Sequence, residues 1–487
     1  MFKNLLIYLW GIPLFGGIVL AYIPYKKRNF LKVVALNFSS LPFIGFLLIW
    51  AFYTEQATQF QFVSKFYWLA NFYIVLGIDS ISLFFLLLTT MLIPICILVS
   101  WFSVDKKYLR EYLISFLILE FFLIGVFCIL DVLFFYIFFE SVLIPMFLII
   151  GIWGSRERKI LAAYYFFFYT LVGSLVMLIS ILYIYYQVGT TDYEIVLAFS
   201  FTELEQKFLW FAFFLAFASK VPMVPFHLWL AEAHVEAPTA GSIILAGVLL
   251  KLGTYGFIRF SIPLFPFASF YFTPLVYTMA VTGIIYTSFT AIRQSDFKRI
   301  IAYTSIAHMN LVMLGIFSFN NIGIEGALFQ SLSHGFVASA LFLAIGVVYE
   351  RYHTRVVKYY GGLGSTMPLY TLIFGFFTLA NISFPGTSSF VGEFLILCGS
   401  LKSNTSATFL SATGIVIGAA YSLWLFNRIS FGNLKLKFCK IFVDVNRREF
   451  MAFLPLIVGT LLTGLIPEIF LSPIRSNVNN LLEFIYL

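Results

Sequence analysis

Charge is scarce in this chain of 487 residues. Asp, Glu, Lys and Arg make up only 11% of it, and the mean hydropathy is +0.97. Soluble globular domains carry about a quarter of their residues as charged side chains. With 61% hydrophobic residues, the chain has too little polar surface for an ordinary soluble domain. The composition therefore indicates a membrane protein.

Cysteines and nucleotide-binding motifs are also scarce. The four cysteines form no CxxC pair: Cys96, Cys128 and Cys398 lie in apolar runs, and Cys439 lies in a basic link. The sequence contains no GxxxxGK[ST] motif and no GxGxxG after a strand-like run. These patterns are the usual signatures of metal or disulfide sites and of phosphate-binding loops. We therefore expect no disulfide framework, no metal site and no cofactor in this chain.

Long apolar runs are abundant. A helix needs about 20 mostly apolar residues to cross a bilayer, and fourteen runs have roughly this length. The sequence thus predicts an all-α polytopic membrane protein with about 14 transmembrane helices. The predicted spans are 5–23, 31–52, 76–101, 111–129, 131–153, 162–187, 207–231, 239–259, 272–292, 299–318, 325–350, 368–400, 408–428 and 450–471.

Basic residues are unevenly shared between the links that join these spans. The odd-numbered links hold 22 of the 30 lysines and arginines. Loops on the cytoplasmic or matrix side of a membrane carry such an excess of Lys and Arg. The distribution therefore predicts that the odd links face the cytoplasm or matrix and that both termini face the opposite side.

Two features near the third predicted span are interpreted as structural rather than functional. Residues 59–62, Gln-Phe-Gln-Phe, alternate as a short strand would, which permits a surface hairpin. Asp79 stands at the head of the span. We interpret it as a helix N-cap, because carboxylates are favoured at that end.

The stretch 217–259, FASKVPMVPFHLWLAEAHVEAPTAGSIILAGVLLKLGTYGFIR, places ionisable residues inside two spans. Lys220 precedes Pro222 and Pro225, each of which removes a backbone donor and disturbs the helix. Lys251 lies within the next apolar run. A charged residue at the centre of a span costs about 2.5–3.5 kcal/mol on insertion scales, so it marks a functional site by default. The two lysines therefore suggest an ion pathway.

Glu140 is the matching acidic residue. It lies inside the run DVLFFYIFFESVLIPMFLIIGIWG, too far from either end for its carboxylate to reach the interface. A carboxylate at this depth needs a cation, and Lys220 is the candidate. The alternative is a structural salt bridge between helices. We favour a functional role, because buried salt bridges contribute little net stability.

Histidines add to the polar content of the spans. A lone histidine on an apolar helix is usually a packing residue, but this chain has several, and we weigh packing and a proton path equally. His334 shares a helix face with Gln330, four residues before it. The other candidates are His227, His234 and Glu236 in the stretch above and His308 in AYTSIAHMN.

The predicted span 368–400 is too long for one straight crossing. Pro385 and Gly386 interrupt it, and Glu393 follows in its second half. Paired interrupted spans at matching positions indicate inverted repeats with a transport site between them. We predict two inverted five-helix repeats, helices 4–8 and 9–13, with broken helices 7 and 12. The predicted domains are a three-helix segment 1–104, the first repeat 105–262, the second repeat 263–430, and a C-terminal helix with tail 431–487.

Four segments carry a resemblance to a known family. They are the stretch 219–259, AYTSIAHMN, the segment GVVYERYHTR…GGL at 346–363, and NISFPGTSSFVGEF. In them the chain resembles the antiporter-like membrane subunits of respiratory complex I and the related large subunits of multisubunit cation/proton antiporters. Sister subunits generally carry lysine where this chain has Glu393. One departure is Ala231-Glu232, where the family commonly has Pro-Asp.

The resemblance implies a proton-translocating subunit of NADH:ubiquinone oxidoreductase that performs no redox chemistry itself. Flavin, iron–sulfur clusters and ubiquinone would be held by partner subunits, which include neighbouring antiporter-like chains, and no nucleic acid is expected. The implied location is the mitochondrial inner membrane with basic loops facing the matrix, or alternatively a bacterial inner membrane. In this family, Glu140 and Lys220 would form an ion pair, Lys251 would be the central proton site, Glu393 the terminal site, and His227, His234, Glu236, His308 and His334 a supporting polar axis.

Two other functions remain open from the sequence. The chain can instead be interpreted as a subunit of a cation/proton antiporter, which sodium dependence and insensitivity to quinone-site inhibitors would reveal. A purely structural scaffold is the third alternative. It would not need ionisable residues inside its spans.

Overall fold

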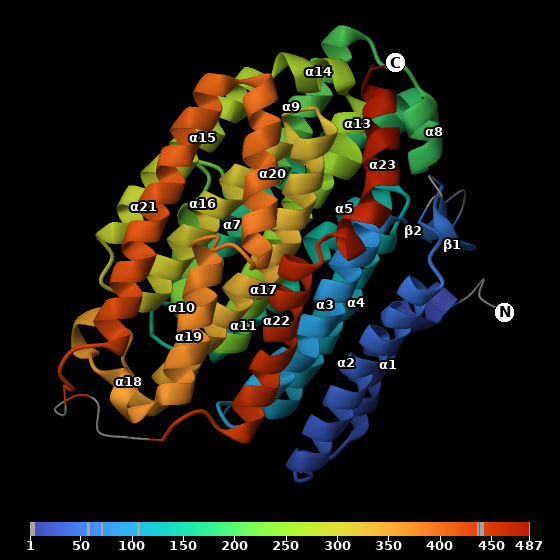
Figure 1. Cartoon of the computed structure of the whole chain (residues 1–487). Helices are drawn as coiled ribbons and strands as arrows, with labels where there is room; N and C mark the ends of the chain where they lie inside the picture. The colour runs from blue at the N-terminus through green and yellow to red at the C-terminus, as the bar shows by residue number, and fades with distance from the viewer. Residues whose placement is uncertain are drawn as a thin grey trace.

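The computed structural model describes most of the chain, and its long helices run side by side through the molecule (Figure 1). Twelve helices of the described part are long and apolar enough to cross a membrane. The predicted all-α membrane class is confirmed. The described residues are 5–55, 59–69, 72–104, 108–435, 438 and 443–486, so that Lys106, Lys107, Lys437, Cys439 and Lys440 lie outside them.

The N-terminal part contains a β-hairpin at the edge of the helical bundle (Figure 1). Its strands pair antiparallel, with Phe66 opposite Ile74. The predicted start of the third span at residue 76 is therefore wrong, because residues up to Ile78 belong to a strand. The elements are α1 Leu5–Tyr22, α2 Arg28–Ala51, β1 Gln61–Leu69, β2 Phe72–Ile78, α3 Ser80–Val99 and α4 Leu109–Cys128.

Asp79 begins α3 as predicted. Its Oδ1 accepts a hydrogen bond from the Ser82 backbone nitrogen at 2.9 Å, and the Ser82 hydroxyl accepts one from the Asp79 nitrogen at 2.9 Å. This capping box satisfies backbone donors that the helix leaves free.

The middle of the chain contains two interrupted helices. α5 ends at Ser141, whose carbonyl cannot receive a helical hydrogen bond from Pro145. α9 ends at Lys220, just before Pro222. The elements are α5 Val132–Ser141, α6 Leu143–Trp153, α7 Lys159–Val188, α8 Tyr193–Ala198, α9 Glu203–Lys220, α10 Leu228–Glu236, α11 Thr239–Ile244, the π-helix η1 Leu245–Leu249, α12 Leu250–Gly256, the π-helix η2 Phe257–Ser261 and α13 Ile262–Leu264.

The rest of the chain repeats this interruption. α19 ends before Pro385, and Gly386 then adopts φ +92°, a conformation that glycine tolerates. The elements are α14 Pro266–Tyr271, α15 Thr273–Ile292, α16 Phe297–Ile316, α17 Asn321–Tyr352, the 3-10 helix η3 Val357–Tyr359, α18 Leu363–Thr366, α19 Pro368–Asn381, α20 Ser388–Ser403, α21 Thr405–Ser430, α22 Arg447–Leu465 and α23 Glu468–Tyr486.

The two predicted spans missing from the twelve are the interrupted ones, 207–231 and 368–400. Each is divided into two shorter helices, α9 with α10 and α19 with α20. The breaks therefore lie where the prolines predicted them. The inverted relation of the two repeats and the domain boundaries stay predictions.

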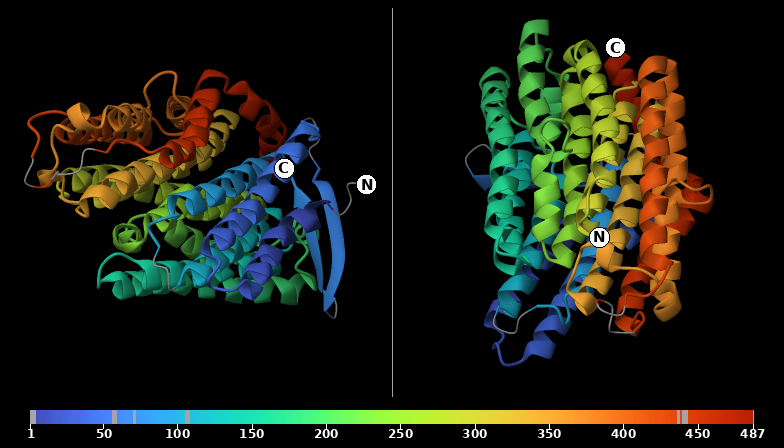
Figure 2. Two further views of the ribbon diagram at one scale, coloured as in Figure 1. Left: turned by 90° about the horizontal axis from the view of Figure 1, so that it is seen from below. Right: turned by 90° about the vertical axis from the view of Figure 1, so that its left-hand side faces the viewer.

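The centre of the bundle is formed by two spans that are buried along their whole apolar windows, Thr239–Leu264 and Asn321–Tyr352. The helices coloured blue and orange lie at different sides of this centre (Figure 2). Because the two central spans are surrounded by protein rather than lipid, they can carry polar side chains.

Candidate functional site: a buried polar axis

Four ionisable side chains from four different helices meet in the centre of the protein. Lys251 of α12 places its Nζ 2.8 Å from Nδ1 of His334 on α17. The ring centroid of His334 lies 5.8 Å from that of His308 on α16. Nδ1 of His308 lies 2.9 Å from Oε1 of Glu393 on α20. Each of these four residues was predicted separately from the sequence. The fold brings them into one row, which we call the polar axis.

Local backbone geometry sets the position of Lys251. It lies between the π-helices η1 and η2, and its ammonium also donates a hydrogen bond to the carbonyl of Ala246 within η1. A π-helical turn takes up one additional residue and so changes which face of the helix the following side chains occupy. Lys251 is fully buried. Sequence periodicity gave no signal for the two π-helices.

Glu393 has two protein partners in the axis. Besides His308, the side-chain nitrogen of Gln330 donates to its Oε1 at 3.1 Å. The Ser333 hydroxyl lies 2.7 Å from that of Ser388, the first residue of α20. These contacts join α17 to the helix that follows the break. Gln330 and His334, one turn apart on α17, thus reach Glu393 and Lys251 respectively.

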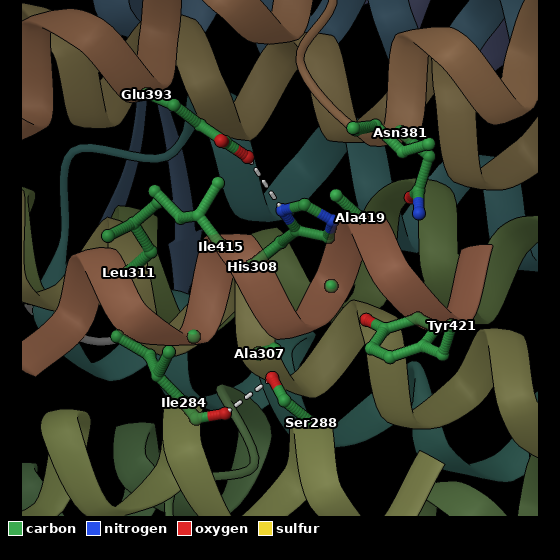
Figure 3. Close-up of a pocket in the computed structure, with 13 residues that line it drawn as sticks. Ile284, Ser288, Ala307, His308, Leu311, Asn381, Glu393, Ile415, Ala419 and Tyr421 are labelled. Atoms are coloured by element: carbon green, nitrogen blue, oxygen red, sulfur yellow. Dashed lines mark hydrogen bonds and ion pairs between the residues drawn. The ribbon is translucent and has the colours of Figure 1, made fainter. Parts of the chain in front are cut away.

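A small cavity adjoins the His308–Glu393 pair. Figure 3 shows the Glu393 carboxylate pointing at the His308 ring, with Asn381 and Tyr421 farther along the same pocket. The volume is about 30 Å³, which is room for about two water molecules. The end of the axis at Glu393 can therefore be hydrated.

Glu140 and Lys220 do not touch. In the described chain, Lys220 Nζ and both Glu140 carboxyl oxygens have no hydrogen-bond partner, and no carboxylate lies within 4.0 Å of Nζ. The ammonium lies instead 4.6 Å from the ring centroid of Phe139, a cation–π distance. The two charges still act on one another. The resemblance implied an ion pair. In the structure the two charged groups lie apart, and the Phe139 ring lies beside the ammonium.

The remaining predicted polar residues lie on α10 or at its start. The His227 ring lies 5.7 Å from that of Tyr286, and the His234 ring stacks on Phe342 at 4.4 Å. Neither imidazole has a hydrogen bond among the residues described, and Glu236 Oε2 has none either. His234 is close enough to Lys251 for the charge of the lysine to act on the imidazole. The structure therefore brings His234 near the axis and leaves His227 apart from it.

Lys298 is a buried cation that sequence reasoning placed in a basic link. It is 3% exposed, and its Nζ donates to the Ala237 carbonyl at 2.6 Å and to the Ser242 hydroxyl at 2.9 Å. Ser242 in turn donates to the carbonyl of His234 at 3.2 Å. One sequence signal could have placed Lys298 on a helix rather than in a link. Lys298 follows Asp296 by two residues, and Asp296 caps α16, so Lys298 lies in the first turn of α16.

A large cavity opens beside Lys298, on the side of the protein that carries basic links. We call this side the basic face. Its volume is about 800 Å³, and Lys159, Lys298, Glu350 and Arg355 line it. Water in this cavity can reach the Lys298 side chain. Within the described ranges no three His, Cys, Asp or Glu residues are grouped as metal ligands, and the absence of a metal or cofactor stays a prediction.

Comparison with known proteins identifies the family. Residues 130–420, which include the whole axis, match the family described as NADH:quinone oxidoreductase/Mrp antiporter, TM. A protein of Marchantia polymorpha named NADH-ubiquinone oxidoreductase chain 4 is 58% identical over 476 residues, covering 97% of this chain and 96% of the relative. Its namesake in Arabidopsis thaliana is 57% identical over 475 residues, covering 97% and 95%.

Two solved structures share the fold. A chain of respiratory complex I from Thermus thermophilus with bound NADH has a TM-score of 0.86 and 29% identity, covering 99% of this chain and all of that chain. A chain of the Mrp complex from Dietzia has a TM-score of 0.87 at 19% identity, covering 99% and 98%, which shows the fold alone. The chain therefore belongs to the NADH:quinone oxidoreductase/Mrp antiporter family, and within it to the NADH-ubiquinone oxidoreductase chain 4 proteins.

Proposed function

We propose that this chain translocates protons as a membrane subunit of NADH:ubiquinone oxidoreductase and that its buried charges carry the protons. The relatives named chain 4 support membership of that complex. The observation that carries the role of this chain is the polar axis, which joins Lys251 to Glu393 through His334 and His308.

The contacts in the axis suit proton transfer. A lysine and a histidine at 2.8 Å share one proton between two nitrogens. An imidazole can accept a proton on one nitrogen and release one from the other, and His334 Nε2 has no partner among the described atoms. A water molecule or a side-chain rotation completes the step across the 5.8 Å between the ring centroids of His334 and His308. Glu393 then attracts the proton as an anion.

Glu140 and Lys220 form the part that controls the transfer. A nearby carboxylate favours the charged form of a lysine, and burial opposes it. Because the two groups are separated and neither has a hydrogen bond within the described chain, a small movement changes their interaction strongly. If the carboxylate moves away, Lys220 releases its proton towards Lys251, and if it approaches, Lys220 holds it.

The basic face supplies the protons in this proposal. Water in the cavity of about 800 Å³ meets Lys298, and Ser242 and His234 lie between Lys298 and the axis. Glu236 adds a buried carboxylate at the same end. These groups, with His227 farther away, supplement the axis.

The proposal also covers the orientation of the chain in the membrane and its partner subunits. The basic loops face the mitochondrial matrix, neighbouring antiporter-like subunits are the partners, and flavin, iron–sulfur clusters and ubiquinone belong to other subunits. Driving energy therefore reaches this chain through contacts with its neighbours. A cation/proton antiporter is the second candidate, supported by the shared fold with the Mrp complex. Transport that depends on sodium and is insensitive to quinone-site inhibitors would favour this second candidate.

The test compares proton pumping with NADH oxidation in membranes that contain Glu140→Gln or Lys220→Ala. Glu120→Gln is the matched control, because Glu120 is a fully buried carboxyl group of α4 that lies outside the axis. Native gels establish assembly. We expect assembled Glu140 and Lys220 variants to lose pumping together with turnover, by about tenfold or more, while the control keeps both. Wild-type pumping in both variants would refute the proposed role of these residues.

A further inference from the structure

A second buried charge cluster lies on the same span as Lys251, towards the opposite face. Residues Ala237, Pro238 and Thr239 line the basic-face cavity at the start of this span. The span then runs away from that cavity to Leu264. Arg259, eight residues after Lys251, is therefore on the outer side of it.

Arg259 is held by a carboxylate and by aromatic rings. It is 8% exposed, and its guanidinium forms an ion pair with Asp79, which is 3% exposed. The guanidinium carbon lies 5.1 Å from the ring centroid of Phe60 and 6.0 Å from that of Tyr193. Asp79 also caps α3. The pair thus fixes the outer end of the Lys251 span to the start of α3.

Tyr255 lies between Arg259 and Lys251, four residues from each. Its hydroxyl accepts a hydrogen bond from Arg259 Nε at 3.3 Å and donates one to the carbonyl of Phe127 at 3.2 Å. The rings of Phe85 and Phe127 pack against it, with centroids 6.1 and 5.1 Å away. Tyr255 is 1% exposed. Its hydroxyl is hydrogen-bonded within the protein, and its ring is packed against other aromatic rings.

Water approaches this cluster from the outer face. A cavity of about 200 Å³ there is lined by Lys65, Asp131 and Asp192. Tyr193 follows directly after Asp192, packs on Phe260 at 5.5 Å between ring centroids, and faces Arg259. From this cavity inward, a proton would meet Tyr193, then the Arg259–Asp79 pair, then Tyr255, before it reached Lys251.

We propose that Asp79, Tyr255 and Arg259 form a closure between Lys251 and the outer compartment. A fixed cation repels an excess proton, and tight aromatic packing excludes the water that would conduct it. The proton of Lys251 consequently leaves through His334 and along the polar axis. The closure rests on the proposed function of Lys251, and it gives that function a direction by blocking the short route outward.

Arg259→Gln tests the closure in sealed membranes that contain the complete complex. We expect the variant to assemble and oxidise NADH, to pump fewer protons per NADH, and to dissipate an imposed pH gradient several-fold faster when NADH is absent. Arg475→Gln is the control, since Arg475 is a half-exposed arginine paired with Glu468 at 3.0 Å and with Glu325 at 3.6 Å. It should retain the gradient as the wild type does.

Two further variants distinguish a proton leak through Lys251 from a leak by another route. Asp79→Asn with Arg259→Gln removes both charges without leaving an unpaired buried carboxylate, so it keeps the test available if the single variant fails to assemble. We expect it to leak as well. Lys251→Met in the Arg259→Gln background should abolish the leak, because the route would pass through Lys251. A leak that persists without Lys251 would overturn the closure but would not affect the proposed function, which Lys251→Met alone tests. Assembled variants that retain the gradient like the wild type would also overturn it.

Discussion

Lys251 and Glu393 show how individual buried charges are accommodated in this protein. Each has partners in the polar axis: a histidine and a backbone carbonyl for Lys251, and a histidine and an amide for Glu393. Glu140 and Lys220 have no hydrogen bond within the described chain. Unpaired buried polar groups cost free energy. We interpret Glu140 and Lys220 as the mobile part of the site and the polar axis as its fixed part.

Glu393→Gln tests the end of the axis. Glutamine keeps the shape and the hydrogen bond to Gln330 but removes the charge that attracts the proton of His308. We expect normal assembly with pumping reduced by about tenfold, measured as protons translocated per NADH oxidised. Glu468→Gln, at a carboxylate whose side chain is 60% exposed, is the control and should pump normally. Equal pumping in both variants would contradict a role for Glu393.

Asp131 gives a pH-dependent prediction. It lies one residue outside the span Val132–Trp153, on the wall of the outer cavity. Burial raises the pKa of its carboxyl from 3.8 to about 6, although hydrogen bonds from Thr191 and Phe134 oppose the change. A raised pKa in the folded state stabilises the protein below the unfolded value, and this contribution is lost as the pH rises through about 6.

Asp131→Asn should therefore flatten the dependence of thermal stability on pH. Asparagine stays neutral and also caps helices well. Between pH 4 and pH 7 the wild type should lose about 2 kcal/mol more stability than the variant, as followed by unfolding temperature in detergent. Glu194→Gln, an exposed neighbour on the same face, should keep the wild-type slope. Parallel curves for Asp131→Asn and the wild type would contradict the shifted pKa.

At the residue scale, the sequence identified several of the buried charged groups, but not Lys298, and it did not show which groups meet. Lys220, Lys251, Glu140 and Glu393 stood out because apolar spans rarely contain charges. Their partners depend on how far each helix is rotated, and a π-helix changes that rotation without a periodic signal. Arg259 was the last residue of the predicted span 239–259, and the structure places it within the π-helix η2, where it is buried.

At the scale of elements, broken and π-helical segments position the axis. α9 ends at Lys220, α20 begins five residues before Glu393, and η1 and η2 flank Lys251. Prolines revealed the breaks in the sequence because a missing N–H disrupts a helix wherever it occurs. The π-helices depend on contacts between helices and were not predicted.

Gly253 determines how closely α12 approaches α9. A Cβ at this position would lie 2.6 Å from Val221 Cγ2 and 2.8 Å from the backbone oxygen of Phe217. Gly253→Ala must therefore push the two helices apart. We expect a loss of about 1–3 kcal/mol in stability and weaker coupling between Lys220 and Lys251, seen as fewer protons pumped per NADH.

The control for this helix-contact prediction is Gly11→Ala. A Cβ at Gly11 of α1 would meet no atom within 4 Å, so the helix should tolerate it. If Gly253→Ala matched Gly11→Ala in stability and in pumping, the close contact of α9 and α12 would have no functional importance.

At the scale of the whole molecule, the charge distribution predicts the orientation in the membrane. Ser295 lies exposed in a basic link, and Ser200 lies exposed in the link 188–206. In a background without native cysteines, a membrane-impermeant thiol reagent should label Ser295→Cys from the matrix side and Ser200→Cys from the opposite side. Labelling of both from one side would contradict the predicted topology.

The helical membrane class and the helix breaks were more predictable from the sequence than the β-hairpin and the C-terminal helix. Hydrophobic length and proline positions are local properties of the sequence, and they predicted the membrane class and the two breaks. The hairpin was expected only at 59–62 but spans Gln61–Leu69 and Phe72–Ile78, since strand pairing depends on two segments at once. The C-terminal tail forms α23, whose Asn477 donates to the Ser80 hydroxyl at 2.8 Å. This tertiary contact has no counterpart in local sequence.

The most direct test of the central claim is the ratio of protons pumped to NADH oxidised in Lys251→Met membranes. Methionine has similar volume and lacks the ionisable group. Lys402→Met, at an exposed lysine of α20, is the control. If Lys251 carries the proton through the axis, its assembled variant loses protons per NADH while Lys402→Met keeps the wild-type ratio. A wild-type ratio in assembled Lys251→Met would contradict the account.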